Sequence, residues 1–278
     1  MIGKALLRLN VNFATKYFIE LYFKNAFKNI DDYDLVFFVN PESITPKIIN
    51  KYIGGACKVV TYMWDSFKNK PNAIGLISCS DKFFTFDNND AERYKINFLP
   101  LFYTDDFKID SCNHTEVYDV LFIGTAHSQR YNIVKRITRN LNAYLFFYSP
   151  SRFVFYFKKY FLGELKNMPI SDISFTSMDK EQVLDKIMKS KSLIDVSHPD
   201  QDGLTIRTIE SIGSNKKLIT TNGNVIKYDF FNKNNILVLT EKTTSSDVEC
   251  FLMQPYQELP EDIYRKYAIS NWINNIVS

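Results

Sequence analysis

Residues 193–222 constrain the fold of this chain more than any other stretch, and they read LIDVSHPDQDGLTIRTIESIGSNKKLITTN. The apolar run that opens the stretch predicts a buried strand, and apolar side chains recur at helical spacing over residues 204–212. Gly213 and Asn215 are residue types that commonly end helices, and residues 217–221 predict a second strand. A strand, a helix and a strand in this order indicate parallel strands of an α/β domain.

Polar residues gather where such a unit would bind a ligand. In a parallel sheet, ligands bind beyond the carboxyl ends of the strands, where helices begin. The free N–H groups and the dipole of a helix start favour a phosphate, and Gly203 would let a ligand approach the backbone closely. Asp202 and Glu210 can accept hydrogen bonds from sugar hydroxyls, while Arg207 can neutralise phosphate. We therefore predict a phosphorylated, polyhydroxylated ligand at His198, Asp202, Gly203, Leu204, Thr205, Arg207 and Glu210.

A second loop of this kind follows another predicted strand, residues 118–123, and precedes a helix. In this loop Gly124 would allow a close approach, and Thr125, Ser128 and Arg130 offer donors to a diphosphate. Alone, the loop is better explained as an ordinary strand-to-helix turn with a surface arginine. Because both loops lie at the same edge of one predicted sheet, the phosphate-binding interpretation is favoured.

Several of these residues also have a purely structural explanation. Arg207 and Glu210 are three residues apart on a predicted helix, which is the spacing of a surface ion pair. Asp202 would serve well as the N-cap of that helix. His198 would be a turn histidine before Pro199. The sequence leaves these alternatives open.

The first part of the chain predicts another α/β domain, because apolar strands alternate with helical patterns. The chain starts almost at a helix, over residues 11–30, so this domain is expected to lack the first strand of a Rossmann-like unit. Its predicted strands are residues 34–40, 58–63, 82–86 and 99–103. Its predicted helices include residues 46–52 and residues 88–94, the second begun by an Asn or Asp cap. The expected organisation is an N-terminal domain at residues 1–104, a polar linker at 105–117, a second domain at 118–260 and a terminal helix at 261–278.

Four stretches in this order carry a resemblance to a known family. They are KVVTYMWDSFKN, DKFFTFDNNDAERY followed by NFLPLFY, DVLFIGTAHSQRY, and residues 193–222. From about residue 34 onward the chain resembles the CgeB-like glycosyltransferases of bacterial surface-polysaccharide and lipopolysaccharide clusters, which have the GT-B fold. Asp202 and Glu210 bracket seven residues, as two acids do in the GT-B donor motif, although the first acid there is more usually Glu.

The resemblance implies a fold, an activity and substrates. It implies two Rossmann-like α/β domains with parallel sheets, and a terminal helix that crosses back to pack on the N-terminal domain. It implies transfer of a sugar from a nucleotide-sugar donor, bound by the second domain, to a glycan or lipid-linked glycan acceptor. The nucleotide sugar is a substrate, so no cofactor is expected. The alternative is a catalytically inactive nucleotide-sugar-binding or scaffold protein of a glycan assembly complex.

Two residues are candidates for the acid–base chemistry of transfer. Asp65 follows a predicted strand in the first domain and is a candidate general base toward an acceptor hydroxyl. Its alternative role is a helix N-cap shared with Ser66. His127 is the other candidate, as a base or as a donor to the leaving diphosphate. No Asp-x-Asp pair follows a predicted strand, so helix dipoles and basic side chains are expected to stabilise the leaving group without an essential metal.

Composition excludes some classes of partner and location. The net charge of +3 is too small to indicate a nucleic-acid-binding protein. The four cysteines have no metal-ligand spacing and are expected to be free thiols in a reducing cytoplasm. No apolar run approaches the length of a membrane span. The aromatic stretch at residues 152–161 is predicted to be a buried helix, with a peripheral contact at the inner face of the cell membrane as the alternative.

Overall fold

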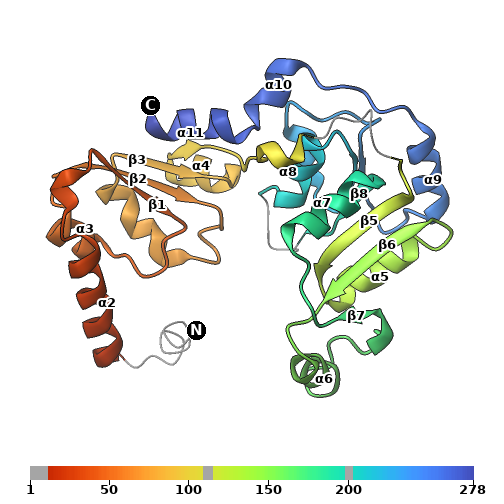
Figure 1. Ribbon diagram of the computed structural model, residues 1–278, viewed down its shortest axis with the longest axis horizontal. Helices are drawn as coiled ribbons and strands as arrows, with labels where there is room; N and C mark the ends of the chain where they lie inside the picture. Colours follow the sequence, from red (N-terminus) through yellow and green to blue (C-terminus); the bar gives the residue numbers. More distant parts are fainter. Residues whose placement is uncertain (1–11, 109–114, 198–202) are drawn as a thin grey trace. The chain divides into compact units, whose positions relative to one another are not determined.

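The computed structural model describes residues 12–108, 115–197 and 203–278, with side chains from residue 17 onward. The chain divides into two compact units, Met1–Pro100 and Leu101–Ser278. Each unit holds one parallel sheet with helices around it (Figure 1). The fold class predicted from the sequence is confirmed at this level.

Unit 1 is built on a four-stranded parallel sheet with the order β1-β2-β3-β4. The inner strand β2 is almost wholly buried, because apolar helices and turns cover it. The strands are β1 (Leu35–Val39), β2 (Lys58–Met63), β3 (Lys82–Thr85) and β4 (Asn97–Phe98). The helices are α2 (Asn12–Ala26), η1 (Ile30–Asp32), α3 (Pro46–Tyr52), η2 (Pro71–Cys79) and α4 (Asn88–Tyr94).

Local signals explain where the helices of unit 1 begin. Thr45 caps α3, because its side chain accepts from the Ile48 N–H, and Pro46 occupies the first turn. Asp87 caps α4 in the same way, toward the N–H groups of Asn89 and Asp90. In the described part of the chain before β1 the regular elements are α2 and η1, both helical.

The strand predicted at residues 99–103 is wrong. Strand β4 lies earlier, at Asn97–Phe98, and ends before Pro100. A proline has no N–H to donate to a strand ladder, so pairing stops there. Tyr103 instead pairs with Ala268 in unit 2.

Unit 2 is built on a six-stranded parallel sheet with the order β10-β9-β8-β5-β6-β7. Successive strands run outward in one direction from β5 to β7 and in the other from β8 to β10. Such a reversal between neighbours opens a crevice at the carboxyl ends of the two central strands, here β5 and β8. The strands are β5 (Tyr118–Thr125), β6 (Ala143–Tyr148), β7 (Ile173–Ser174), β8 (Ser190–Asp195), β9 (Lys217–Thr220) and β10 (Ile236–Val238).

Helices cover both faces of this sheet, with one apolar core on each face. One core includes Val134, Phe155 and Val248, and the other includes Ile187, Ile209 and Tyr267. The helices are α5 (Ser128–Ile137), α6 (Arg152–Tyr160), α7 (Lys180–Met188), α8 (Ile206–Gly213), α9 (Ser245–Met253), α10 (Glu261–Lys266) and α11 (Ile269–Val277). Short 3-10 helices are η3 (Asp105–Phe107), η5 (Ile170–Asp172) and η6 (Gly223–Lys227).

Three features of unit 2 differ from the sequence prediction. The single terminal helix predicted at residues 261–278 is two helices, because the Tyr103 backbone takes the Tyr267 carbonyl and the Ile269 N–H as partners between them. Part of the predicted linker, η3, packs into unit 2 through the buried Phe107. Helix α9 was not predicted.

Candidate functional site at the carboxyl edge of unit 2

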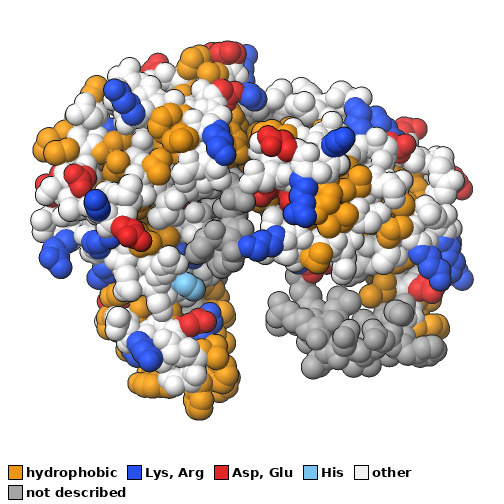
Figure 2. Space-filling view, turned by 180° about the vertical axis from the view of Figure 1, so that it is seen from behind, with side chains coloured by type: hydrophobic (Ala, Val, Ile, Leu, Met, Phe, Trp, Pro, Cys, Tyr) orange, Lys and Arg blue, Asp and Glu red, His pale blue; other side chains and the backbone are white. Residues whose placement is uncertain are grey.

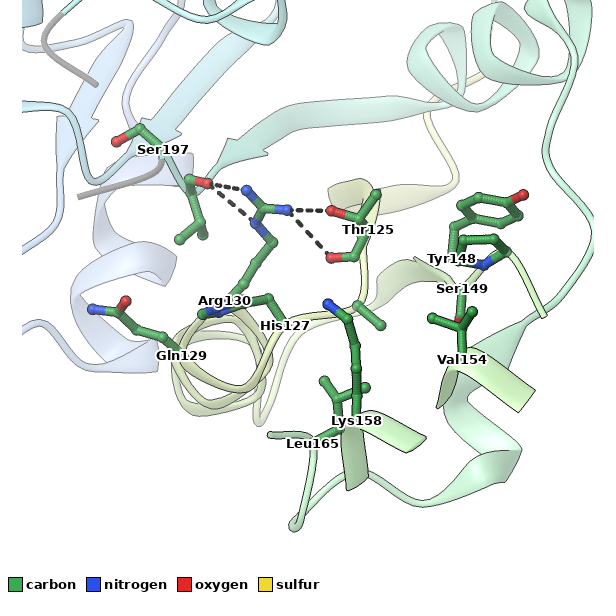
Figure 3. A pocket seen from close by; sticks show the side chains of 13 residues that line it. Thr125, His127, Gln129, Arg130, Tyr148, Ser149, Val154, Lys158, Leu165 and Ser197 are labelled. Atoms are coloured by element: carbon green, nitrogen blue, oxygen red, sulfur yellow. Dashed lines mark hydrogen bonds between the residues drawn. The ribbon is translucent and has the colours of Figure 1, made fainter. Parts of the chain in front are cut away.

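A pocket of about 310 Å³ opens at the carboxyl ends of β5 and β6 and beside the end of β8 (Figure 3). Its walls come from the β5–α5 loop, the start of α5, the β6–α6 loop, helix α6 and the residues after β8. The polar side chains in these walls belong to Thr125, His127, Gln129, Arg130, Tyr148, Ser149, Lys158 and Ser197. The predicted loop that follows β8 reaches this pocket through Ser197, whereas the predicted contacts Gly203, Leu204, Thr205, Arg207 and Glu210 do not line it.

Arg130 joins the two loops. Its Nε and Nη2 donate to the Val196 carbonyl at 3.2 Å and 3.0 Å, and its Nη1 donates to the Thr125 carbonyl and hydroxyl at 3.2 Å and 2.9 Å (Figure 3). Burial lowers the pKa of the guanidinium, and the charge of Asp195 acts in the opposite direction. Arg130 thus holds the pocket walls together through four hydrogen bonds and brings a positive charge to the site.

Gly124 and Ser128 contact other parts of unit 2: Gly124 lies against Phe122, and Ser128 is hydrogen-bonded to Leu165. A Cβ at Gly124 would lie 2.9 Å from Cζ of the Phe122 ring, so the glycine leaves room for a buried aromatic side chain. The Ser128 hydroxyl accepts from the Leu165 N–H at 2.6 Å and ties α5 to the segment after α6. Packing of the protein itself is therefore sufficient reason for both residues.

The start of α5 has no side-chain cap. His127 occupies the N-cap position with an extended backbone, and its side chain makes no capping hydrogen bond. The imidazole is exposed and lines the pocket beside Gln129. Because the first N–H groups of a helix lack intrahelical partners, the α5 terminus offers donors and a positive dipole end to an anion in the pocket.

The start of α8 is capped by Thr205, whereas Asp202 was proposed for that role from the sequence. The Thr205 side chain accepts from the Thr208 N–H, so the alternative that Asp202 is the N-cap is wrong. Asn222 donates to the Gly203 carbonyl at 3.1 Å, and Leu204 is buried in the core. His198 and Asp202 lie outside the described residues.

Arg207 and Glu210 form an ion pair on α8. It is not a surface pair, since only 15% and 12% of the two side chains are exposed. Within the described residues, the buried Glu210 Oε2 and Arg207 Nη1 find no partner with hydrogen-bond geometry. Burial raises the pKa of Glu210, the charge of Asp195 raises it further, and Arg207 lowers it. These are the two atoms that face each other in the ion pair, so each is the electrostatic partner of the other at this buried position.

Asp195, whose charge acts on Glu210, was not predicted as a site residue. It ends β8, is buried, and accepts from the hydroxyls of Thr208 at 3.3 Å and Thr220 at 3.2 Å. Burial raises the pKa of its carboxyl group, against the lowering effect of these hydroxyls and of Arg207. A carboxylate within an otherwise apolar strand was the available signal, because such a group is rarely buried without a specific partner.

Asp65 belongs to unit 1, at the carboxyl end of β2. Its Oδ1 accepts from the Ser66 N–H at 3.0 Å and from the Asn69 side-chain amide at 2.9 Å. These bonds stabilise a turn, whereas the structural alternative was a helix N-cap, and no helix begins there.

Metal-binding clusters are absent from the described residues, where no three His, Cys, Asp or Glu side chains gather. Cys57, Cys79 and Cys250 are free thiols. Among the helices that the structure describes, none is long and apolar enough to cross a membrane.

The chain is similar in fold to solved structures, while no protein-family model and no curated protein matches it. A glycosyltransferase from Rickettsia africae is 15% identical, with a TM-score of 0.60 over 96% of this chain and 81% of that chain. HepE from Anabaena, solved in complex with UDP-glucose, is 8% identical, with a TM-score of 0.61 over 92% of this chain and 80% of that chain. A putative UDP-N-acetylglucosamine 2-epimerase from Listeria monocytogenes is 9% identical, with a TM-score of 0.53 over 95% and 77%. The chain therefore has the GT-B fold, which transferases and epimerases share.

Proposed function

We propose that this protein is a glycosyltransferase that moves a sugar from a nucleotide-sugar donor to a bacterial surface glycan, such as a lipopolysaccharide, O-antigen or capsule. The observation that carries the proposal is the pocket of unit 2, where an uncapped helix start and basic side chains meet at the switch point of a parallel sheet. A nucleoside diphosphate matches this combination of charge and donors. The resemblance to CgeB-like glycosyltransferases and the UDP-glucose complex of HepE support the same donor class.

The two parts of the donor, its diphosphate and its hydroxyl groups, bind different sets of side chains. The diphosphate lies against the α5 terminus, within reach of Thr125, His127 and Lys158. Lys158 was not predicted as a donor-site residue, and its Nζ lies 3.2 Å from a Glu164 carboxylate oxygen in this structure. The hydroxyl groups of the donor bind the carboxylate of Glu210, whose charge Arg207 balances in a buried ion pair.

Transfer of the sugar then requires no essential metal ion. The acceptor hydroxyl oxygen forms a bond to the anomeric carbon, and the bond from that carbon to the diphosphate breaks. The leaving group gains negative charge, which the α5 N–H groups and nearby cations stabilise. The proton of the acceptor hydroxyl passes to a general base, for which Asp65 and His127 are the candidates.

The test is release of nucleoside diphosphate from a panel of nucleotide sugars, with a glycan acceptor, measured for the wild type and for His127→Ala. We expect release from one nucleotide class, at a lower rate in the variant. Gln129→Ala is the matched control, because Gln129 lines the same pocket from the same helix start. Binding of a nucleotide sugar without any release would instead identify an inactive nucleotide-sugar-binding or scaffold protein.

A further inference from the structure

Helix α6 exposes a row of aromatic side chains, and hydrophobic side chains gather at the end of unit 2 that carries this helix (Figure 2). Phe153, Phe161 and Tyr160 are 78%, 79% and 71% exposed. Rings four residues apart stack along the helix, with centroids 6.3 Å apart for Phe153 and Phe157 and 5.4 Å apart for Phe157 and Phe161. The prediction that this stretch is buried is therefore wrong for most of its rings, although Phe155 is fully buried. Exposed apolar patches of this kind mark binding surfaces.

The helix that carries this face is firmly held. Ser151 caps it through the Val154 N–H at 3.1 Å, and Phe155 packs in the core of unit 2. The Lys159 ammonium donates to the Met168 carbonyl at 2.6 Å. In Figure 1, α6 stands at the end of unit 2 beside β7. The aromatic face is thus presented on an anchored element, as an interaction surface needs to be.

Charge identifies what this face binds. Residues 152–166 contain the cations Arg152, Lys158, Lys159 and Lys166 and a single acid, Glu164. A basic helix with Phe and Tyr on one side is typical of segments that lie in the interface of an anionic bilayer. A second copy of the same surface would bring like charges together, which disfavours self-association through it.

We propose that α6 docks the protein on an anionic membrane surface, with Phe153, Phe157, Tyr160 and Phe161 inserted among the lipid headgroups. The same helix lines the pocket through Val154 and Lys158 (Figure 3). A helix is roughly 10 Å across, so docking brings the pocket to about that distance from the lipid surface. The docking itself does not depend on the proposed function. That a lipid-linked acceptor binds at this pocket does rest on it.

The test compares three proteins by co-sedimentation with vesicles of phosphatidylcholine, with and without phosphatidylglycerol. They are the wild type, Phe153→Ser/Phe161→Ser, and the control Ile226→Ser/Met253→Ser, which removes two other exposed apolar side chains of unit 2. We expect the wild type and the control to bind the anionic vesicles, more weakly at high salt. The Phe variant loses roughly tenfold or more of that affinity, because the inserted apolar area is gone.

Circular dichroism establishes that both variants are folded, and nucleotide binding is measured on the same samples. Loss of vesicle binding in the Phe variant supports docking whether or not a nucleotide binds, and absent nucleotide binding counts only against the proposed function. A wild type that ignores anionic vesicles overturns the docking. So does vesicle binding that survives in the Phe variant, which would point to the exposed aromatic side chains of α2. If the wild type instead forms a dimer, does not bind vesicles, and becomes monomeric only in the Phe variant, the aromatic face of α6 binds a second copy of the chain.

Discussion

The guanidinium of Arg130 donates two hydrogen bonds to the backbone carbonyl of Val196, a residue 66 positions further along the chain. This contact fastens the loop after β5 to the end of β8, the two strands between which the sheet order reverses. The pocket walls at this edge are therefore held in place before any ligand arrives. Such preorganisation lowers the ordering cost of binding.

Replacing Arg130 by alanine is expected to weaken both folding and binding. The variant leaves the Val196 carbonyl without its donor, so the free energy of unfolding should fall by about 1–3 kcal/mol. Urea denaturation measures this change. Arg130→Lys should recover only part of it, because an ammonium group cannot span both loops. Equal stability of wild type and Arg130→Ala would show that the contact contributes nothing.

Gly213 is required by a neighbour rather than by its own backbone. A Cβ there would lie 2.6 Å from Cγ of the buried Tyr103, and the Tyr264 hydroxyl donates to the Gly213 carbonyl at 2.8 Å. We expect Gly213→Ala to lower the free energy of unfolding by about 1–3 kcal/mol through overpacking. Gly223→Ala is the control, since a Cβ there meets no atom within 4 Å. Similar melting temperatures for the two variants would contradict this account.

The stability of unit 2 should depend on pH through Glu210. Its pKa is raised in the folded protein, mainly by burial, from an ordinary value of 4.5. The folded state therefore binds the proton more tightly than the unfolded state, so the contribution of Glu210 to stability is greatest below pH 4.5 and declines as the pH rises toward the raised pKa.

Glu210→Gln removes this dependence while keeping the size of the side chain. The stability of the variant relative to the wild type is expected to increase as the pH rises from about 4.5, the ordinary pKa. Denaturant unfolding at a series of pH values measures the difference. Asp195 is present in both proteins, and because its charge raises the pKa of Glu210, its ionisation adds to the expected difference in the same direction. A difference in stability that stays constant with pH would contradict the raised pKa.

His127→Ala is expected to reduce nucleotide binding without affecting stability. The imidazole is exposed and makes no capping hydrogen bond, so the melting temperature should not change. If it donates to a phosphate, the affinity for a nucleoside diphosphate should fall by about tenfold, the value of one charge-assisted hydrogen bond. Calorimetric titration measures this, and the corresponding nucleoside should bind both proteins equally. An unchanged affinity would remove His127 from the site.

The sequence predicted those elements whose limits are set by neighbouring residues. Helix α3 begins at a threonine cap followed by proline, and α4 begins at an aspartate cap, and both were predicted at their observed positions. The alternation of strands and helices predicted the parallel sheet of unit 2, and with it the convergence of two loops at one edge. Local sequence was sufficient for these features.

Features that depend on distant residues were not predicted. Gly213 was predicted to end a helix and does end α8, but its close contact with Tyr103, which lies far away in the sequence, was not predicted. Arg130 was interpreted as a phosphate donor, and the carbonyl that takes two of its hydrogen bonds comes from another loop. The rings of α6 were expected inside because aromatic residues usually are, and only tertiary packing shows that a single one, Phe155, is fully buried.

The most direct test of the central claim is calorimetric titration of the wild type with UDP, GDP, CMP and ADP and their sugars, repeated with Glu210→Gln. The account predicts that one nucleotide class binds the wild type. The sugar conjugate of that nucleotide should bind more weakly to the variant, because a neutral amide replaces the carboxylate that accepts hydrogen bonds from the sugar hydroxyl groups. Folded protein that binds none of these compounds, or a variant that binds them as tightly as the wild type does, would contradict the donor site at α5 and α8.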